Sequence, residues 1–475
     1  MIPSLIFAEY YIRFYLLGIC MFDLNLNKTP KIAYKELRSD SFTPKVILSN
    51  FHVEALLESA YINALKGRYS IMILKSAFKI FKLNDIYLFS SPSTKINLNE
   101  INKDRKYLDW IDYFRELSPS SNLNFPLPLG GIGYLGYEFC KEIEEFKNIN
   151  FSSKKSINVP TCSFIFGRDF LIFDHLYNKA LICSISYSFD ISDFDLNKRI
   201  ESIESNLDNL NFNLKESNCN DLKILNPINQ SSLNSSISYI KNEIQNLNII
   251  NCSLVNILEA SSSISPKNAY SILRNENPSP YMFYFDFPSF AFFGASHEMI
   301  LKLHGDELFS RPILEFSKKQ KEEALLKNKN LTNYLHISLV DRFLNDLGKI
   351  AKELKVEESY IEEYAKSMHI ASNINGKIKS KNALHSIFPP ICGVSKINAL
   401  HLINNIESNL REFCGGVIVY IDRDGNFDSA TTSSCIAYKN EKYYLYASLN
   451  ISIDSINENE ILQDNMNILL HCLEG

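Results

Sequence analysis

A single histidine, His369, stands in the stretch SMHIASNINGKI at residues 367–378, a short apolar run that ends in Asn375-Gly376. Histidine changes its charge near physiological pH, so it can serve as a general acid or base. An imidazole within an apolar run is equally suited to a buried, hydrogen-bonded place in a protein core. The stretch alone does not separate a catalytic histidine from a core histidine.

The chain lacks the motifs of several common site chemistries. It contains no G-x-x-x-x-G-K-[ST] phosphate-binding loop and no H-E-x-x-H zinc motif. Its ten cysteines are scattered without a C-x-x-C pair, which argues against a zinc site and against dithiol redox chemistry. A large chain without a disulfide framework is typical of a reducing compartment, so we expect a cytoplasmic protein.

The composition is that of a globular protein with one large core or two to three ordinary ones: 475 residues, 45% hydrophobic and 22% charged. The formal net charge of −5 gives no basic surface for nucleic acid. The apolar stretch at residues 4–22 contains Glu9 and Arg13, and a charge is costly at the centre of a bilayer. No small-residue cleavage site of a signal peptide follows it. We therefore expect neither a nucleic-acid partner nor a membrane span.

The elements that must position such a histidine can be predicted best after residue 235. The patterning predicts amphipathic helices at 235–248, 333–354 and 457–474, the second of them ending at Gly348 or continuing past it. Aromatic-rich runs at 281–296 predict two strands joined by a short turn, and Asp424-Gly425 predicts a hairpin. We expect looser packing at 92–128 and a polar linker with one helix at 200–235. Consecutive antiparallel strands with helices between them indicate an α+β fold, with large antiparallel sheets packed face to face and helices outside.

Nine stretches occur in an order that resembles the chorismate-utilising enzymes, and most closely the large subunit of anthranilate synthase. The likeness covers roughly residues 30 to 472. The stretches are LLESAYINALKGRYSI (56–71), GGIGYLGYE (130–138), NPSPYMFYFDF (277–287), GASHEM (294–299), RPI (311–313), LVDRFLNDLGKIA (339–351), MHIAS (368–372), GGVIVYIDRDGNFD (415–428) and DSINENE (454–460). The LLES and NPSPYMF stretches are specific to the anthranilate branch, as opposed to aminodeoxychorismate and isochorismate synthases.

The resemblance implies a function in tryptophan biosynthesis. Such subunits bind chorismate and Mg²⁺, add ammonia to the ring and eliminate pyruvate to leave anthranilate. A separate glutamine amidotransferase subunit supplies the ammonia, and tryptophan binds at a second site and inhibits. We accordingly expect an N-terminal region at 1–215 with the tryptophan-type site and a chorismate-binding catalytic region at 236–475, the two forming one interleaved body.

The resemblance also assigns roles to particular residues. His369 falls on the histidine of the family, and Glu298 on the acid of a motif in which His297 replaces the usual proline. The other positions are Tyr420 and Gly416 for substrate, Glu460 for the metal ion, and Glu58, Ser59, Pro280, Tyr281 and Met282 for tryptophan. Each has a plainer interpretation: Glu298 as a carboxylate at a strand end, Tyr420 as a core aromatic, and the tryptophan-type residues as fold packing.

Several positions depart from the family pattern, and they cluster on its chemistry. Leu335 and Gln463 stand where the family has metal-binding glutamates, so we expect weakened Mg²⁺ binding. Ser434 occupies the position of an arginine that grips a substrate carboxylate, and Asn450 lies where a glycine exposes its N–H to the substrate. A charge-assisted hydrogen bond contributes roughly 1.5–3 kcal/mol. Loss of a two-pronged arginine contact alone therefore predicts a rate lower by about 10²- to 10³-fold.

Three hypotheses follow from the resemblance and its departures. The first is a strongly diverged anthranilate synthase large subunit, supported by the ordered motifs. The second is a relative without catalysis, a pseudoenzyme that binds tryptophan or a partner, supported by the replaced residues together with the retained LLES and NPSPYM stretches. The third is a decaying gene product with neither role.

Overall fold

The computed structural model describes residues 29–59, 67–92, 94–151, 153–190, 195–212, 221–317, 329–363, 367–379, 383–390, 392–453, 455 and 457–474. The apolar stretch at 4–22 lies outside them. Within the part described, no helix is both long and apolar enough to span a membrane.

Antiparallel strands dominate the described part of the chain, and 21 of them form one continuous hydrogen-bonded set. These strands are β1 Lys31–Arg38, β2 Ala55–Glu58, β3 Tyr69–Leu83, β4 Ile86–Ser90, β5 Lys95–Asn97, β6 Ile132–Leu135, β7 Cys162–Asp174, β8 Lys179–Ser186, β9 Lys223–Asn226, β10 Asn251–Ser261, β11 Tyr281–Phe287, β12 Phe290–Ser296, β13 Met299–His304, β14 Glu307–Ser310, β16 Ala351–Val356, β19 Ile374–Ile378, β20 Gly393–Val394, β21 Val417–Ile421, β22 Phe427–Thr431, β23 Ser434–Lys439 and β24 Lys442–Ser452. A separate three-stranded sheet consists of β15 Ile313–Ser317, β18 Ser367–Ala371 and β17 Tyr360–Glu363.

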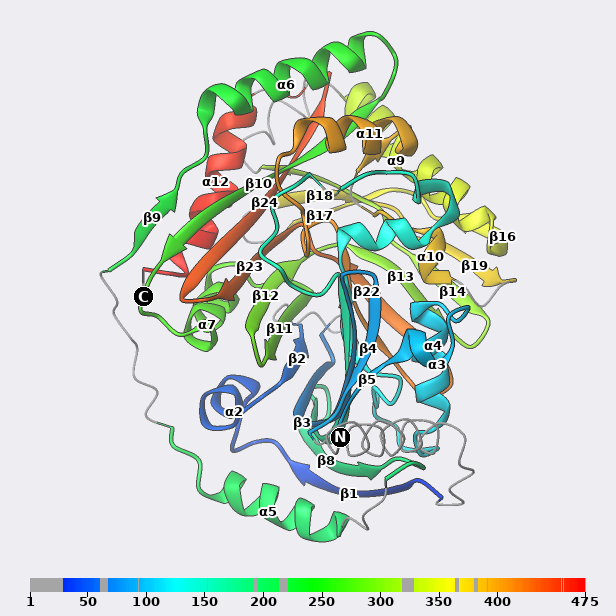
Figure 1. The fold of residues 1–475 in the computed structure, drawn as a ribbon, viewed down its shortest axis with the longest axis vertical. Coiled ribbons are helices and arrows are strands. Elements are labelled where there is room, and N and C mark those ends of the chain that lie inside the picture. Colours follow the sequence, from blue (N-terminus) through cyan, green and yellow to red (C-terminus); the bar gives the residue numbers. More distant parts are fainter. Residues whose placement is uncertain are drawn as a thin grey trace, which may run out of the picture.

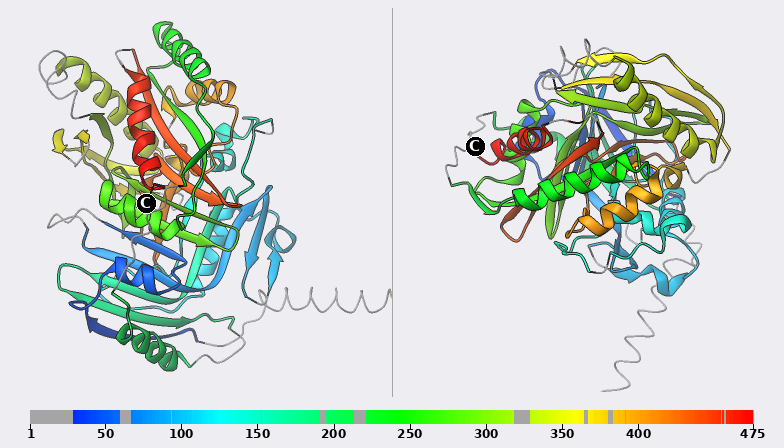
Figure 2. Two further views of the ribbon diagram at one scale, coloured as in Figure 1. Left: turned by 90° about the vertical axis from the view of Figure 1, so that its left-hand side faces the viewer. Right: turned by 90° about the horizontal axis from the view of Figure 1, so that it is seen from above.

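The helices lie on the outside of these sheets (Figures 1 and 2). They are α2 Pro44–Asn50, α3 Leu98–Ile101, α4 Tyr107–Glu116, α5 Leu196–Asp208, α6 Gln230–Gln245, α7 Pro266–Glu276, α9 Lys329–Gly348, α10 Ala383–Ser386, α11 Lys396–Ile406 and α12 Glu458–His471. Two hydrophobic clusters lie beneath them: α4 and α9 contribute to one, and α2, α5, α6, α7, α11 and α12 contribute to the other. The predicted α+β class, with large antiparallel sheets and outer helices, is confirmed.

Strands from the two halves of the chain pair directly with each other. β2 pairs with β11, so that Glu58 lies opposite Met282. β6 pairs with β21, so that Ile132 lies opposite Tyr420. The division at 1–215 and 236–475 stays a prediction, but these pairings bring residues of both segments to one set of strands.

The small sheet carries the histidine on which the sequence analysis began. His369 is in its central strand, β18, opposite Glu362 of β17. Helix α9 packs on this sheet, and His336 of α9 forms a 2.9 Å hydrogen bond between its Nε2 and the Oγ of Ser372. The helix ends at Gly348, and β16 begins three residues later.

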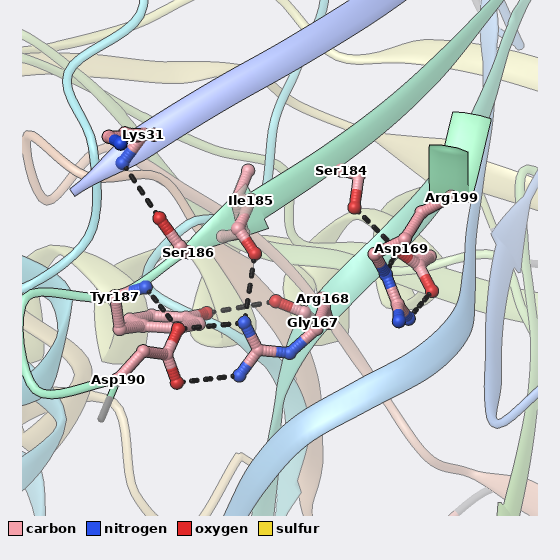
Figure 3. A network of polar contacts seen from close by, with 10 residues as sticks. All are labelled: Lys31, Gly167, Arg168, Asp169, Ser184, Ile185, Ser186, Tyr187, Asp190 and Arg199. Atoms are coloured by element: carbon pink, nitrogen blue, oxygen red, sulfur yellow. Dashed lines mark hydrogen bonds and ion pairs between the residues drawn. The ribbon is translucent and has the colours of Figure 1, made fainter. Parts of the chain in front are cut away.

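A network of ion pairs and hydrogen bonds connects β7, β8 and α5 in the N-terminal part of the chain (Figure 3). Arg168 of β7 donates to both carboxylate oxygens of Asp190, at 2.7 and 2.8 Å. Next to it, Asp169 accepts from the Oγ of Ser184 in β8 at 2.7 Å and from Arg199 of α5. Buried charges are tolerated only when they are paired in this way. The network therefore joins β7 and β8 to α5, at the lower end of the molecule in Figure 1.

The local predictions were mostly confirmed. The aromatic run at 281–296 forms β11 and β12, and the predicted hairpin at Asp424-Gly425 joins β21 to β22, with Gly425 at a φ of 88°. The expectation of loose packing at 92–128 was wrong. Helix α4 in this segment buries Tyr107, Trp110, Ile111 and Phe114 in the core, because its apolar residues recur at helical spacing between polar turns.

Candidate active site

Glu298 lies in the short connection between β12 and β13. Its backbone N–H donates to the Oγ of Ser296 at 3.3 Å, and its carbonyl accepts from the N–H of Thr431 at 3.1 Å. Burial raises the pKa of the Glu298 carboxyl to about 7, against the opposing effects of Arg342, Thr431, His369 and Arg311. The residue keeps a partly exposed surface. It is therefore an acid that is partly protonated at neutral pH, beside three cationic or titratable side chains.

His369 lies next to Glu298 but is fully enclosed, with 0% of its surface exposed. Its ring meets the ring of His297 edge to face, with centroids 4.8 Å apart and an interplanar angle of 82°. His297 is the residue that directly precedes Glu298 and that stands in place of the family's proline. The replacement thus puts a second imidazole against the first. The Nε2 of His297 also lies 3.3 Å from the Oγ of Ser279.

Arg311 connects this pair of histidines to the small sheet. Its Nη1 donates to both carboxylate oxygens of Glu362, at 3.0 and 2.8 Å, and its Nη2 donates to the carbonyl oxygen of His297 at 2.8 Å. Arg311 is only 5% exposed. Glu362 is the cross-strand neighbour of His369, and the ring of His297 contacts that of His369, so one guanidinium binds two neighbours of the histidine.

Helix α9 directs a further cation at Glu298. The Nε of Arg342 is buried and has no hydrogen-bond partner among the residues that the structure describes. Of the charges acting on Glu298, that of Arg342 lowers the pKa most. Leu335 lies seven residues before Arg342, so both lie on nearly the same face of the helix. Helix α9 therefore presents an aliphatic group and a cation where the resemblance led us to expect a carboxylate.

A cavity of about 580 Å³ lies beside this site, between strands from both halves of the chain. All five residues assigned to tryptophan line it: Glu58, Ser59, Pro280, Tyr281 and Met282. Tyr420 and Arg311 line it as well. Glu298 and His369 are not among its lining residues.

One end of this cavity has the charges that an amino acid needs. Glu58 accepts from Tyr270 Oη at 2.7 Å and from Arg274 Nε at 2.8 Å, while its Oε2 is buried without a partner in the described part of the chain. Arg68 lines the same cavity, where its guanidinium donates to Asp174 from Nε at 3.1 and 3.2 Å and from Nη2 at 2.8 Å. The carbonyl of Arg68 accepts from the N–H of His175. Burial lowers the pKa of His175, and the nearby charge of Glu58 opposes this effect. A carboxylate oxygen in need of a donor and a guanidinium in the wall of the same cavity suit an ammonium and a carboxylate on one carbon atom.

The two residues assigned to substrate have different surroundings. Tyr420 lies with the tryptophan-type residues in the cavity. Gly416 is buried, and its N–H already donates to Phe413 O at 3.1 Å and to Thr432 Oγ1 at 3.1 Å. A Cβ at position 416 would lie 2.3 Å from the carbonyl oxygen of Leu135. Close packing against β6 therefore explains the glycine without a ligand.

The residues assigned to the metal ion do not form a carboxylate set. Glu460 lies in the first turn of α12 and is exposed, and Gln463, one turn later, donates to Asn467 at 2.8 Å instead of offering a carboxylate. In the described ranges no three His, Cys, Asp or Glu side chains gather as metal ligands would. With Leu335 on α9 as well, the residues present do not fit the oxygen-rich coordination of Mg²⁺.

Comparison with known protein families identifies the family of this chain. A family model described as "chorismate binding enzyme" matches residues 69–462. The chain belongs to the family of chorismate-binding enzymes. The anthranilate synthase component 1 of Spirochaeta aurantia is 27% identical over 449 residues, covering 90% of this chain and 92% of that protein. The corresponding protein of Acetivibrio thermocellus is 30% identical over 362 residues, covering 70% of this chain and 72% of that protein.

A solved structure shares the fold of this chorismate-binding enzyme. Anthranilate synthase component I from Streptococcus pneumoniae TIGR4 superimposes with a TM-score of 0.73 at 23% identity, and the match covers 92% of this chain and 99% of that one. The resemblance read from the ordered motifs is thereby confirmed at the level of family and fold. The low identities agree with the expectation of a strongly diverged member of the family.

Sequence reasoning missed several residues of this chorismate-binding enzyme that now stand out. Arg311 and Arg342 were noted only as parts of the RPI and LVDRFLNDLGKIA motifs, and Glu362 was not considered. At the far end of the cavity Asp428 accepts from Tyr281 Oη at 3.2 Å and lies 3.4 Å from Lys302 Nζ. Asp428 was part of a quoted motif, but no local pattern signals these contacts, because each joins residues on different strands.

Proposed function

We propose that the protein is a diverged anthranilate synthase large subunit that converts chorismate and ammonia to anthranilate, pyruvate and water in tryptophan biosynthesis. One observation carries this proposal: a carboxyl with a pKa of about 7, Glu298, beside His369 in a chain of the chorismate-binding family. Such an acid can both give and take a proton at neutral pH.

The two residues suit the two proton movements of the reaction. When ammonia adds to the ring, the ring hydroxyl leaves as water and needs a proton, which the protonated form of Glu298 donates. When pyruvate leaves, the ring carbon that took up nitrogen loses its proton, and His369 is placed to accept it. The cations Arg342 and Arg311, whose charges act on Glu298, favour the anionic form of that carboxyl after the transfer.

The cavity beside the site is proposed to bind tryptophan as a regulator. Its ammonium would satisfy Glu58 Oε2, its carboxylate would meet Arg68, and its indole would lie against Tyr281, Met282 and Tyr420. An ammonia-supplying glutamine amidotransferase is the expected partner, by the resemblance to component 1 proteins, and the cytoplasm the expected compartment.

The proposal is tested by giving the purified chain chorismate, ammonium salt and Mg²⁺ and following anthranilate fluorescence. We expect a slow but definite signal that His369→Ala abolishes. Thermal unfolding of both proteins shows whether the variant folds. A wild-type signal no greater than that of the variant would rule out catalysis.

A second candidate function has observations of its own in its favour. Leu335, Gln463 and Ser434 replace functional groups, while the cavity keeps an unpartnered carboxylate oxygen. A chain that senses tryptophan without making anthranilate would have this combination. Binding of tryptophan in calorimetry, together with no anthranilate fluorescence from the purified chain, would favour this second function. Absence of binding at millimolar tryptophan would rule it out.

A further inference from the structure

The side chain of Arg311 lies between the cavity and two neighbours of His369. Arg311 lines the cavity and bonds both Glu362 and the carbonyl of His297. We propose that Arg311 is the residue through which a ligand in the cavity repositions His369. This inference rests on the proposed function, because it specifies how the tryptophan site would act on the catalytic residue.

The first step is the contact between ligand and Arg311. If the amino-acid head group sits at Glu58 and Arg68, the aromatic side chain lies against Tyr281 and Tyr420. Arg311 is within reach there, because it lines the cavity and its charge acts on the hydroxyl of Tyr281. Planar guanidinium groups stack on aromatic faces, and the attraction is stronger where water is excluded. The Arg311 side chain is 6% exposed, whereas the Arg68 and Lys302 side chains are 42% and 45% exposed. Arg311 is thus the cation that an indole would affect most.

The second step is the transfer to the small sheet. Two hydrogen bonds of 3.0 and 2.8 Å tie Arg311 Nη1 to Glu362. Glu362 is the direct cross-strand neighbour of His369, and such neighbours have Cβ atoms about 4.5–5.5 Å apart. A shift of the guanidinium toward the cavity therefore pulls on the carboxylate that shares a strand face with the imidazole.

The third step reaches His369 through His297. Arg311 Nη2 holds the carbonyl of His297, whose ring packs edge to face on His369. The same ring lies 3.3 Å from Ser279 Oγ, and Ser279 immediately precedes the cavity residues Pro280 and Tyr281. Movement of the cavity wall is thus communicated to His369 through two of its neighbours, Glu362 and His297, and the position of His369 depends on Arg311.

Nuclear magnetic resonance of the full chain with ¹⁵N-labelled histidine tests this route without requiring activity. The chain has nine histidines, and single substitutions assign the ring signals of His369 and His175. His175 reports occupancy, because it lies near Glu58 at the head-group end. Saturating tryptophan is expected to shift both signals in the wild type.

Two variants interrupt the route. Glu362→Gln keeps the shape of the side chain, and Arg311→Lys keeps the positive charge but loses the planar guanidinium group. In both variants tryptophan should still shift the His175 signal but should no longer shift the His369 signal. Glu357→Gln is the matched control, since Glu357 accepts from Asn373 and Asn375 instead of from Arg311. It should leave the His369 shift intact.

The possible failures can be told apart. A wild type that binds tryptophan by calorimetry but shows no shift at His369 overturns the coupling and leaves tryptophan binding standing. A His369 shift that persists in either folded variant also overturns it. A wild type that takes up no tryptophan contradicts the ligand part of the proposed function, and the coupling falls with it.

Discussion

The ring of His297 packs edge to face on the ring of His369, with 4.8 Å between centroids. His297 immediately precedes Glu298, the other residue assigned to proton transfer. A position where the resemblance led us to expect proline therefore carries a side chain in contact with His369. Divergence at this site has altered the surroundings of His369 while keeping the acid and the imidazole together.

Glu298 should make the stability of the protein depend on pH. Its folded pKa of about 7 lies above the ordinary value of 4.5, so between these values the folded state binds more protons than the unfolded state. Stability is then lost as the pH rises through that window. Glu298→Gln removes the charge, so at pH 8 its free energy of unfolding should exceed that of the wild type by on the order of 1–3 kcal/mol. At pH 4 the two proteins should differ little. Denaturant unfolding at both pH values measures the difference. The buried Glu138 contributes equally to both proteins and cancels in the comparison. Equal pH dependence of the two proteins would contradict a raised Glu298 pKa.

Removing Arg342 should raise the pKa of Glu298 further. The Arg342 guanidinium is the strongest of the charges that favour the ionised carboxyl. In Arg342→Leu the side-chain carbon signal of Glu298 should titrate at a higher pH than in the wild type. Arg423→Leu, at a position on the β21–β22 hairpin, serves as the control and should leave the titration unchanged. A lower titration midpoint in Arg342→Leu would contradict the account.

Glu58 should determine tryptophan affinity. Glu58→Gln removes the carboxylate charge offered to the ligand ammonium, and loss of one charge-assisted hydrogen bond of about 1.5–3 kcal/mol predicts roughly 10- to 100-fold weaker binding by calorimetry. Tyr270→Phe removes a 2.7 Å hydrogen bond to the same carboxylate but keeps its charge. That control should lower the free energy of unfolding by about 1 kcal/mol with a much smaller change in affinity. Equal losses of affinity in both variants would indicate a packing role for Glu58.

Mg²⁺ should bind weakly, and restoring carboxylates should strengthen its binding. Leu335→Glu combined with Gln463→Glu restores a carboxylate at each of the two positions where the resemblance places metal ligands, and a hard cation prefers oxygen ligands. Calorimetry with MgCl₂ should give a tighter dissociation constant for the double variant than for the wild type. Gln463→Asn, which adds no charge, is the control. Wild-type binding as tight as that of the double variant would show that other residues hold the ion.

The sequence predicted what depends on local pattern. The aromatic strands at 281–296 and the hairpin at Asp424-Gly425 follow from alternation and turn chemistry, and the ordered motifs placed the chain in its family. The contact of Arg311 with Glu362 could not be predicted, because it joins residues 51 positions apart whose proximity is set by the sheet. Tyr420 was assigned to substrate, but it lines the cavity with the tryptophan-type residues. The direction in which a strand side chain points depends on partners that one sequence does not show.

The central claim is that Glu298 and His369 still transform chorismate. It is tested most directly by measuring anthranilate and pyruvate together after adding chorismate and ammonium to the wild type, Glu298→Gln and His369→Ala. We expect equal amounts of the two products from the wild type, and rates lower by about 10²- to 10⁴-fold in each variant. Pyruvate and anthranilate at the same trace level in all three folded proteins would contradict the claim and favour a relative without catalysis.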